Sequence, residues 1–321
     1  MRYGLPYKGS KSSIAEWIVD NLPSADVFCD LFFGGGAVTH RAMLTGKYKR
    51  FIVNDIDARL PKLFLECAYG KHTVENHSEW VSREEFHRLK DTDAYVALVW
   101  SFWNNGKNYI YGKNVEDYKH AYHLAVFNGD LRPFEKLGIK LTRSTEKAVY
   151  DRYEDYKRQL QRLYGVDGEI RNEQLERSQI AENIQRLQSL QSLQSLQILQ
   201  SYGTSFERVP IPDGALIYCD IPYYNTNCGK YYGFDHETFY QWALQQDNIF
   251  ISEYSMPSCF IEVANKEKVI LSSASGNGDK AVERIYTNRR TYDRMSQHQK
   301  DIIATNRAVQ VSMFDYNPYQ E

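Results

Sequence analysis

The sequence has few of the features that mark metal-binding, disulfide-stabilised or membrane-spanning proteins. Only five of its 321 residues are cysteine, at positions 29, 67, 219, 228 and 259, and they form neither a Cys-x-x-Cys pair nor a spaced Cys/His cluster. This argues against a zinc site, and the odd number argues against a disulfide framework. No apolar run approaches the roughly 18 residues that span a bilayer, and the N-terminus lacks the apolar core of a signal peptide. We therefore expect a cytoplasmic protein that needs no metal.

Excess charge of one sign is also absent. The formal net charge is −2, which by itself does not indicate a nucleic-acid partner. The charge is nevertheless uneven, because residues 101–165 hold 12 Lys and Arg against 8 Asp and Glu. Such a local surplus fits either contact with a phosphate backbone or an ordinary solvated surface.

The first 70 residues have the pattern of an α/β fold. Apolar residues at helical spacing run from Ile14 to Leu22, and the apolar stretch 27–31 predicts a strand that leads directly into three glycines. A helix over 37–45 and a second strand over 51–53 follow. Strand, glycine turn, helix and strand form a βαβ unit, which implies a parallel sheet.

The middle of the chain differs. From about residue 72 to 180 it is polar and rich in Tyr and Asn, which indicates a mostly helical insertion with loops. Residues 185–202 then consist of six Gln-x-apolar triplets. A period of three makes the apolar side chains spiral around a helix, whereas a coiled coil needs a period of 3.5. We read this stretch as a low-complexity expansion that leads into a strand near 198–202.

The α/β pattern resumes after the repeat. Strands are predicted at 215–219 and 249–251, with a helix over 235–245 between them that Asp235 caps. Two further strands, near 269–271 and 282–286, are separated by a Ser/Gly/Asn loop and predict an antiparallel hairpin.

Two motifs carry the chemistry that the sequence suggests. In the first, Gly34 to Gly36 lie at a strand-to-helix turn, and Asp55 ends the next strand 21 residues after Gly34. Glycine lets the backbone approach a ligand, and a carboxylate at such a strand end accepts hydrogen bonds from a ribose. Because Thr39 stands where a dinucleotide fingerprint has its third glycine, the pattern favours a nucleoside-containing cofactor other than NAD or FAD. A purely structural turn is the alternative.

The second motif is Asp220-Ile221-Pro222-Tyr223 at the end of a later strand. A carboxylate and a backbone carbonyl there could accept both hydrogens of one amino group, while a tyrosine ring stacks on the attached base. Two acceptors would free the nitrogen lone pair, which is otherwise delocalised into the base, for nucleophilic attack. Taken alone, the tetrapeptide fits equally well a turn that ends a strand beside packed aromatics.

Together, these motifs resemble the Dam-like family of N6-adenine-specific DNA methyltransferases, in the order typical of its alpha class. Residues 7–11 resemble the N-terminal cofactor motif, Asp30–Gly36 the glycine motif, and Asp220–Tyr223 the Asp-Pro-Pro-Tyr catalytic motif. Residues 54–56 resemble the contacts to the cofactor's ribose and adenine, and residues 252–254 and 284–288 resemble later segments. The resemblance covers roughly residues 1–70 and 205–295.

The resemblance implies a Rossmann-like class I S-adenosylmethionine-dependent fold: a mostly parallel sheet with a C-terminal antiparallel hairpin, split by a helical insert. The catalytic domain would comprise residues 1–71 and 206–321, and the target-recognition insert residues 72–205. The implied activity is methyl transfer from S-adenosylmethionine to N6 of an adenine flipped out of double-stranded DNA. A monomer or a weak dimer without a membrane partner is expected.

The resemblance also assigns roles to residues. The expected catalytic residues are Asp220, Ile221, Pro222 and Tyr223. The expected cofactor contacts are Tyr7, Lys11, Asp30, Phe32, Gly34, Gly36, Asp55, Ile56 and Asp220. The expected DNA contacts are Trp103, Asn104, Asn105, Lys107 and Asn108, from a loop that interleaves aromatic, amide and basic residues, with Arg143 and Lys147.

Ile221 departs from the family pattern, which has proline there. Its expected contribution is a backbone carbonyl, which isoleucine supplies as well, and Pro222 still biases Ile221 towards an extended conformation. The sequence leaves N4-cytosine methylation, RNA-adenine methylation and an inactive DNA-binding relative open as alternatives. Residues Gln310–Phe314 resemble the peptide that docks on bacterial sliding clamps, although a C-terminal strand that packs on the domain fits them better.

Overall fold

The protein folds into two compact units that are each assembled from separate stretches of chain. The computed structural model describes residues 2–73, 75–164, 179–193, 199–224, 233–270, 279–301 and 303–304. Unit 1 comprises Met1–Ser13, Gly34–His40 and Arg59–Gln197, and unit 2 comprises Ile14–Phe33, Arg41–Ala58 and Ile198–Glu321. Gln310–Phe314, residues 194–198 of the repeat and Cys228 lie outside the described residues.

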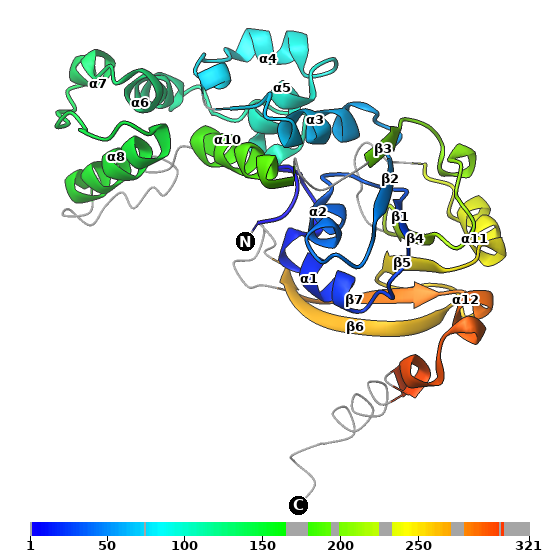
Figure 1. Cartoon of the computed structure of the whole chain (residues 1–321). Coiled ribbons are helices and arrows are strands. Elements are labelled where there is room, and N and C mark those ends of the chain that lie inside the picture. Colours follow the sequence, from blue (N-terminus) through cyan, green and yellow to red (C-terminus); the bar gives the residue numbers. More distant parts are fainter. Residues whose placement is uncertain are drawn as a thin grey trace, which may run out of the picture. The chain divides into compact units, whose positions relative to one another are not determined.

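Unit 2 contains a seven-stranded, mostly parallel sheet with the order β3-β2-β1-β4-β5-β7-β6 (Figure 1). Its strands are β1 (Val27–Asp30), β2 (Arg50–Asn54), β3 (Leu199–Tyr202), β4 (Leu216–Asp220), β5 (Ile249–Glu253), β6 (Ile261–Ile270) and β7 (Asp279–Thr287). β1 to β5 pair in parallel, whereas β7 pairs antiparallel with both β5 and β6. The protein is therefore a mixed α/β protein, as its sequence predicts.

The order of the strands reverses between β1 and β4. From β1 the chain adds β2 and β3 on one side, and from β4 it adds β5 on the other. Because all five strands are parallel, their carboxyl ends meet along one edge of the sheet. The residues at these ends include Asp30, Asp55, Asp220 and Glu253. In open α/β sheets, ligands bind at this edge near the point of reversal.

Helices cover the two faces of this sheet. Every residue of β1 and β5 is buried, as is usual for strands covered on both sides. On one face, Cys29, Ile217 and Ile251 pack with Phe239 and Ala243 of α11 (His236–Gln245). On the other face, the ring of Phe28 lies 6.2 Å from that of Tyr218 and 6.0 Å from that of Phe51. In Figure 1, α11 lies on one side of the sheet and α1 (Ala15–Asp20) on the other.

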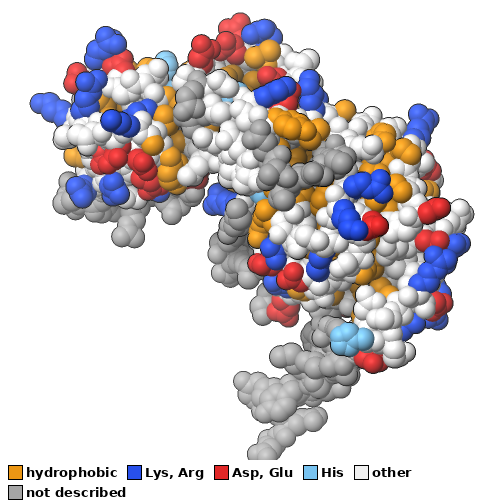
Figure 2. Space-filling view, in the orientation of Figure 1, with side chains coloured by type: hydrophobic (Ala, Val, Ile, Leu, Met, Phe, Trp, Pro, Cys, Tyr) orange, Lys and Arg blue, Asp and Glu red, His pale blue; other side chains and the backbone are white. Residues whose placement is uncertain are grey.

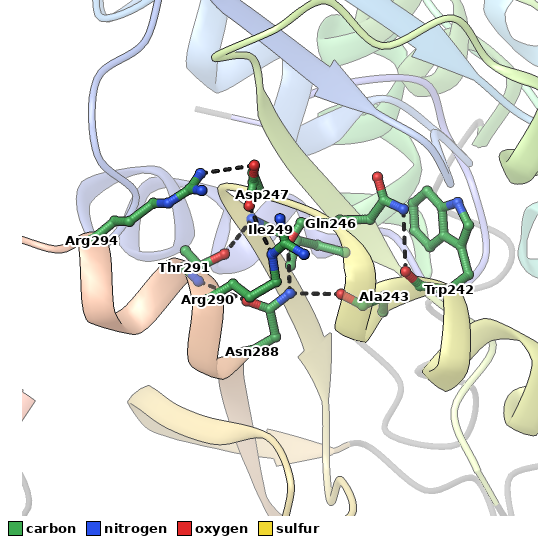
Figure 3. Close-up of polar contacts among 9 residues, drawn as sticks. All are labelled: Trp242, Ala243, Gln246, Asp247, Ile249, Asn288, Arg290, Thr291 and Arg294. Carbon is green, nitrogen blue, oxygen red and sulfur yellow. Dashed lines mark hydrogen bonds and ion pairs between the residues drawn. The ribbon is translucent and has the colours of Figure 1, made fainter.

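Asparagine 288 joins the end of one helix to the start of another (Figure 3). Its side-chain amide donates to the carbonyls of Ala243 and Gln246, each at 2.7 Å, at the end of α11. Its side-chain oxygen accepts from Thr291 N at 2.8 Å and so caps α12 (Arg289–Arg294). Because Asn288 is fully buried, these three bonds replace water at two helix ends.

Strand β3 is the last part of the triplet repeat, and residues just beyond it fix its position on β2. Asn54 of β2 donates its side-chain amide to Thr204 O at 3.0 Å and accepts from Thr204 N at 3.1 Å. A Cβ added to Gly203 would collide with the Cβ of Ala58, so the chain passes closer there than any other residue allows. Both contacts involve residues outside the repeat.

The described residues of unit 1 form helices and loops, with one isolated bridge between Ser101 and Tyr109. Its α-helices beyond residue 58 are α3 (Arg59–Ala68), α4 (Arg83–Leu89), α5 (Ala94–Val99), α6 (Glu116–Asn128), α7 (Arg132–Lys136), α8 (Val149–Tyr164) and α10 (Gln179–Ser189). Short 3-10 turns lie at Lys11–Ser13, Glu75–His77, Phe102–Asn104 and Leu190–Leu193. Another 3-10 turn, Phe206–Arg208, lies in unit 2, and the helix α2 spans Ala37–Met43. No helix among the described residues is long and apolar enough to cross a membrane.

The elements expected from the sequence are largely present. The predicted strand near 198–202 is β3, and the predicted hairpin is β6 and β7, with β6 beginning eight residues earlier than expected. Asp235 caps α11 as predicted, since its side chain accepts from Thr238 N at 3.1 Å. The first half of the repeat, up to Leu193, is helical.

Replacing Asn288 by alanine should destabilise unit 2. The change removes three buried hydrogen bonds and leaves backbone groups at two helix ends without partners, so the free energy of unfolding should fall by about 3 kcal/mol. Urea unfolding would measure this loss. Arg290→Ala, which removes an exposed ion pair with Asp247 beside the same helices, should leave stability nearly unchanged. Equal losses in the two variants would contradict the role assigned to Asn288.

Candidate functional site

The carboxyl ends of β1 and β4 bring Asp30 and Asp220 together within unit 2. Asp30 is the register partner of Tyr218, and Leu31 N donates to Tyr218 O at 3.0 Å. Asp220 follows Tyr218 by two residues, so the two carboxylates end neighbouring strands where the strand order reverses. Burial first, and then the charge of Asp30, raise the pKa of the Cys219 thiol well above its usual value. This thiol stays protonated and is a poor nucleophile.

The chain after Asp220 is held by contacts from several elements of unit 2. The side chain of Ile221 is 2% exposed and joins the core. The next residue, Pro222, accepts a hydrogen bond at its carbonyl from His236 Nε2 at 2.7 Å. The ring of Tyr223 lies 4.5 Å from that of Tyr254, nearly at a right angle. The predicted catalytic motif is therefore a loop held by other elements of unit 2 rather than a free strand end.

Two glutamates from the neighbouring strands fix the tyrosines of this loop. The hydroxyl of Tyr223 donates to the buried carboxylate of Glu283 on β7. Burial, followed by the charges of Asp220 and Glu283, raises the pKa of Tyr223 well above its usual value, so the hydroxyl keeps the proton that it donates. Glu253 of β5 accepts from Tyr224 N at 2.9 Å and from Tyr254 N at 2.6 Å.

The end of β2 combines a buried carboxylate with an exposed apolar side chain. Asp55 is buried, and its Oδ1 accepts from Asp57 N at 2.9 Å, which turns the chain away from the strand. The intervening Ile56 is 66% exposed. An acidic group beside an uncovered apolar surface suits a ribose with an attached flat base. S-adenosylmethionine contains both groups, so these residues fit it.

Phe32, which the sequence assigns to the cofactor, lies in an aromatic cluster of unit 2. Its ring is 5.6 Å from each of the rings of Phe206, Phe234 and Phe239. These contacts show that Phe32 helps to pack α11 against the sheet edge.

In unit 1, the N-terminal segment packs on the glycine turn. Gly34 and Gly36 have φ values of +50° and +67°, which side chains rarely allow. Leu5 N donates to Gly35 O at 2.7 Å, and a Cβ on Gly35 would lie 2.7 Å from the Cβ of Tyr7. The first and second predicted cofactor motifs are thus in direct contact. Lys11 is buried in the turn that follows.

Two residues that the sequence reading missed hold this N-terminal segment. Arg186 of α10 donates from Nε to Gly4 O at 2.8 Å and from a terminal nitrogen to Tyr3 O at 2.5 Å. The backbone N of Gly4 donates to Nδ1 of His40 at 3.0 Å. Burial, and next the charge of Arg186, lower the pKa of His40 to about 4, so the ring is neutral and Nδ1 is free to accept. The only local signal was that Arg186 is the one charged residue in the repeat.

The loop predicted to contact DNA exposes some of its expected residues and uses others internally. Phe102 and Trp103 are 48% and 52% exposed, and Lys107 and Asn108 are also exposed. Trp103 and Asn104 both adopt left-handed backbone angles. Such angles are uncommon for residues other than glycine and cluster at functional sites.

Asn104 and Asn105 bond to the backbone of the same unit. Asn104 donates its side-chain amide to Leu98 O at 2.8 Å, and its carbonyl accepts from Lys8 N at 3.3 Å. Asn105 Oδ1 accepts from Lys107 N at 2.8 Å and from Asn108 N at 3.1 Å. The loop therefore touches the start of the N-terminal cofactor motif.

Basic side chains are dispersed. On the face shown in Figure 2, Lys and Arg lie among Asp and Glu rather than in one continuous area. Several are paired, for example Arg83 with Glu116 at 2.7 Å and Arg132 with Asp130 at 2.7 Å. Arg143 and Lys147 are exposed and lie on the segment between α7 and α8. Over the described ranges, no group of three His, Cys, Asp or Glu side chains could hold a metal ion.

A comparison with protein-family models identifies the chain. Residues 7–300 match the model of the D12 class N6 adenine-specific DNA methyltransferases. The chain belongs to this family. No curated protein matches it. The match confirms the family that the motifs indicated, and with it methylation of adenine in DNA, for which this family uses S-adenosylmethionine as the methyl donor.

Arg186→Ala should loosen the N-terminal segment of this methyltransferase. The carbonyls of Tyr3 and Gly4 would lose their buried donor, which should cost about 2 kcal/mol of stability and weaken cofactor binding. Thermal unfolding with and without S-adenosylmethionine would measure both effects. Arg132→Ala, which removes an exposed arginine of the same unit, is the matched control and should change neither. Unaltered cofactor affinity in Arg186→Ala would show that cofactor binding does not depend on this contact.

Proposed function

We propose that the loop at the end of β4 binds the amino group of the target adenine. The Asp220 carboxylate and the main-chain carbonyl of Ile221 would accept its two hydrogens, and the ring of Tyr223 would stack on the base. The observation that carries this proposal is the place of Asp220 beside Asp30, at the carboxyl end of the strands where their order reverses.

These acceptors would change the reactivity of the amino nitrogen. In free adenine its lone pair is delocalised into the ring, and two hydrogen-bond acceptors favour a geometry that frees it. S-adenosylmethionine, when bound, supplies a methyl group already activated by its sulfonium. Asp220 would accept the proton that the amino nitrogen loses as the new N–C bond forms and the S–C bond of the methyl donor breaks, leaving the electron pair on sulfur. Cys219 takes no part, because its thiol is buried and protonated.

Binding of S-adenosylmethionine would use the residues of the predicted cofactor motifs. In unit 2, Asp55 would accept from the ribose hydroxyls, Ile56 would pack on the adenine ring, and Asp30 and Phe32 would line the end of β1. In unit 1, the positive φ angles of Gly34 and Gly36 let the backbone approach the ligand, and Tyr7 and Lys11 belong to the segment that packs on this turn. The strand order is compatible with a Rossmann-like class I methyltransferase fold.

Target recognition would fall to the helical part of unit 1, within residues 72–205. Exposed Trp103 offers a ring that could stack on a base, and Lys107 and Asn108 offer groups for phosphate and base edges. Asn104 and Asn105 would act by shaping the loop, because their side chains bond to its backbone. Arg143 and Lys147 would contact phosphates. A cytoplasmic location, a monomeric or weakly dimeric state, and clamp binding through residues 310–314 stay predictions.

Asp220→Ala should abolish turnover while leaving cofactor binding largely intact. Loss of the acceptor should lower kcat by about 10²–10⁴-fold. Mass spectrometry of DNA incubated with labelled S-adenosylmethionine would measure the product and its rate. N4-methylcytosine as the wild-type product, methylation of RNA alone, or DNA binding without any methylation would each overturn the assignment to adenine in DNA. Full activity of Asp220→Ala would overturn the mechanism.

Trp103→Ala and Lys107→Ala should weaken DNA binding in different ways. Loss of a stacked ring costs about 1–3 kcal/mol, whereas loss of one phosphate contact lowers the salt dependence of binding by about one ion. Fluorescence anisotropy over a range of salt concentrations separates the two. Lys49→Ala, an exposed lysine of unit 2 paired with Asp26, is the control and should bind like the wild type. If Trp103→Ala and Lys107→Ala also bind DNA like the wild type, this loop does not contact DNA.

A further inference from the structure

The catalytic loop of this protein is constrained by a side chain outside its motif. His236 is the first residue of α11, and its Nε2 lies 2.7 Å from the carbonyl oxygen of Pro222. Because a carbonyl only accepts, the histidine donates. The other ring nitrogen, Nδ1, lies 3.1 Å from the carbonyl oxygen of Phe234, so both ring nitrogens of His236 face backbone acceptors.

His236 is supported by a rigid element. Asp235 caps α11 by accepting from Thr238 N at 3.1 Å and from the Thr238 hydroxyl at 2.6 Å. Phe239 and Ala243 of the same helix are fully buried against the sheet. The ring of Tyr224 lies edge-on to that of His236 at 5.3 Å. The imidazole is thus held in place by its own helix and by the ring of Tyr224.

The hydrogen bond constrains the backbone on both sides of Pro222. The proline ring already fixes φ, so an anchored carbonyl also fixes ψ. These two angles orient the peptide that precedes Tyr223 relative to the peptide whose carbonyl belongs to Ile221. Both groups that contact the adenine in the proposed mechanism, the Ile221 carbonyl and the Tyr223 ring, therefore depend on the geometry at Pro222.

We propose that His236 is a positioning residue for methyl transfer, acting through the carbonyl of Pro222. The assignment rests on the proposed function of the Asp220–Tyr223 loop. Where the family pattern has the first of its two prolines, this chain has Ile221. The contact from His236 supplies from outside the loop some of the rigidity that the missing proline ring would give.

The test is a comparison of His236→Gln, His236→Asn and His236→Ala. In His236→Gln the side-chain amide nitrogen lies approximately where Nε2 was, so it can donate to the Pro222 carbonyl. In His236→Asn the amide nitrogen lies approximately where Nδ1 was and does not reach that carbonyl. Small misplacements of catalytic groups cost up to about 100-fold in rate. We expect kcat for adenine methylation to fall about 10–100-fold in the Ala and Asn variants. KM for S-adenosylmethionine should change little, and Gln should restore most of the rate.

Controls separate this role from folding and from the proposed function. Gln241→Ala, an exposed change on the same helix, should leave kcat unaltered, and thermal unfolding should show that all three His236 variants are folded. An Ala variant as fast as the wild type, or a Gln variant no faster than Asn, would overturn the role of His236. A wild-type protein that makes no N6-methyladenine would instead overturn the proposed function.

Discussion

The site depends on the parallel pairing of β1 with β4. Asp30 and Asp220 are separated by 190 positions in the sequence, and no local preference brings them together. The register does so, because Leu31 N donates to Tyr218 O and both strands end at the same edge. A slip of one residue would turn the side chains of a strand to the opposite face, so the buried apolar residues on both faces of the sheet hold this register in place.

The loop after β4, which we propose as the active-site loop, is held by the elements around it. Ile221 anchors it in the core, α11 holds the Pro222 carbonyl, β7 holds the Tyr223 hydroxyl, and β5 holds Tyr224 N. On the proposed assignment, these contacts would compensate for the proline that Ile221 replaces. A proline ring at position 221 would restrict the backbone from within the loop. Here side chains from α11, β7 and β5 restrict the loop from outside.

The sequence was most informative where structure follows from local chemistry. Apolar runs predicted the strands, and Asp235 at the start of a predicted helix indicated a cap that the structure contains. It was least informative where distant residues meet. The contacts of Arg186 with Tyr3 and Gly4, and of Glu283 with Tyr223, leave no trace in the pattern near either partner. Residue type showed only that the amides of Asn104 and Asn105 suit base recognition, and the structure adds that both side chains bond to the protein backbone.

Because of the triplet repeat, the side chains of the edge strand β3 do not by themselves determine its register on β2. Residues 196–199 read Leu-Gln-Ile-Leu and residues 199–202 read Leu-Gln-Ser-Tyr, so a shift of three positions would offer β2 the same first two side chains. What distinguishes the two alignments is the junction after the strand, where Gly203 passes Ala58 and Thr204 bonds twice to Asn54. Triplets could therefore be gained or lost before β3 without moving Tyr202, whose carbonyl accepts from Asp55 N. The reason is that the contacts that set the register of β3 all follow the strand.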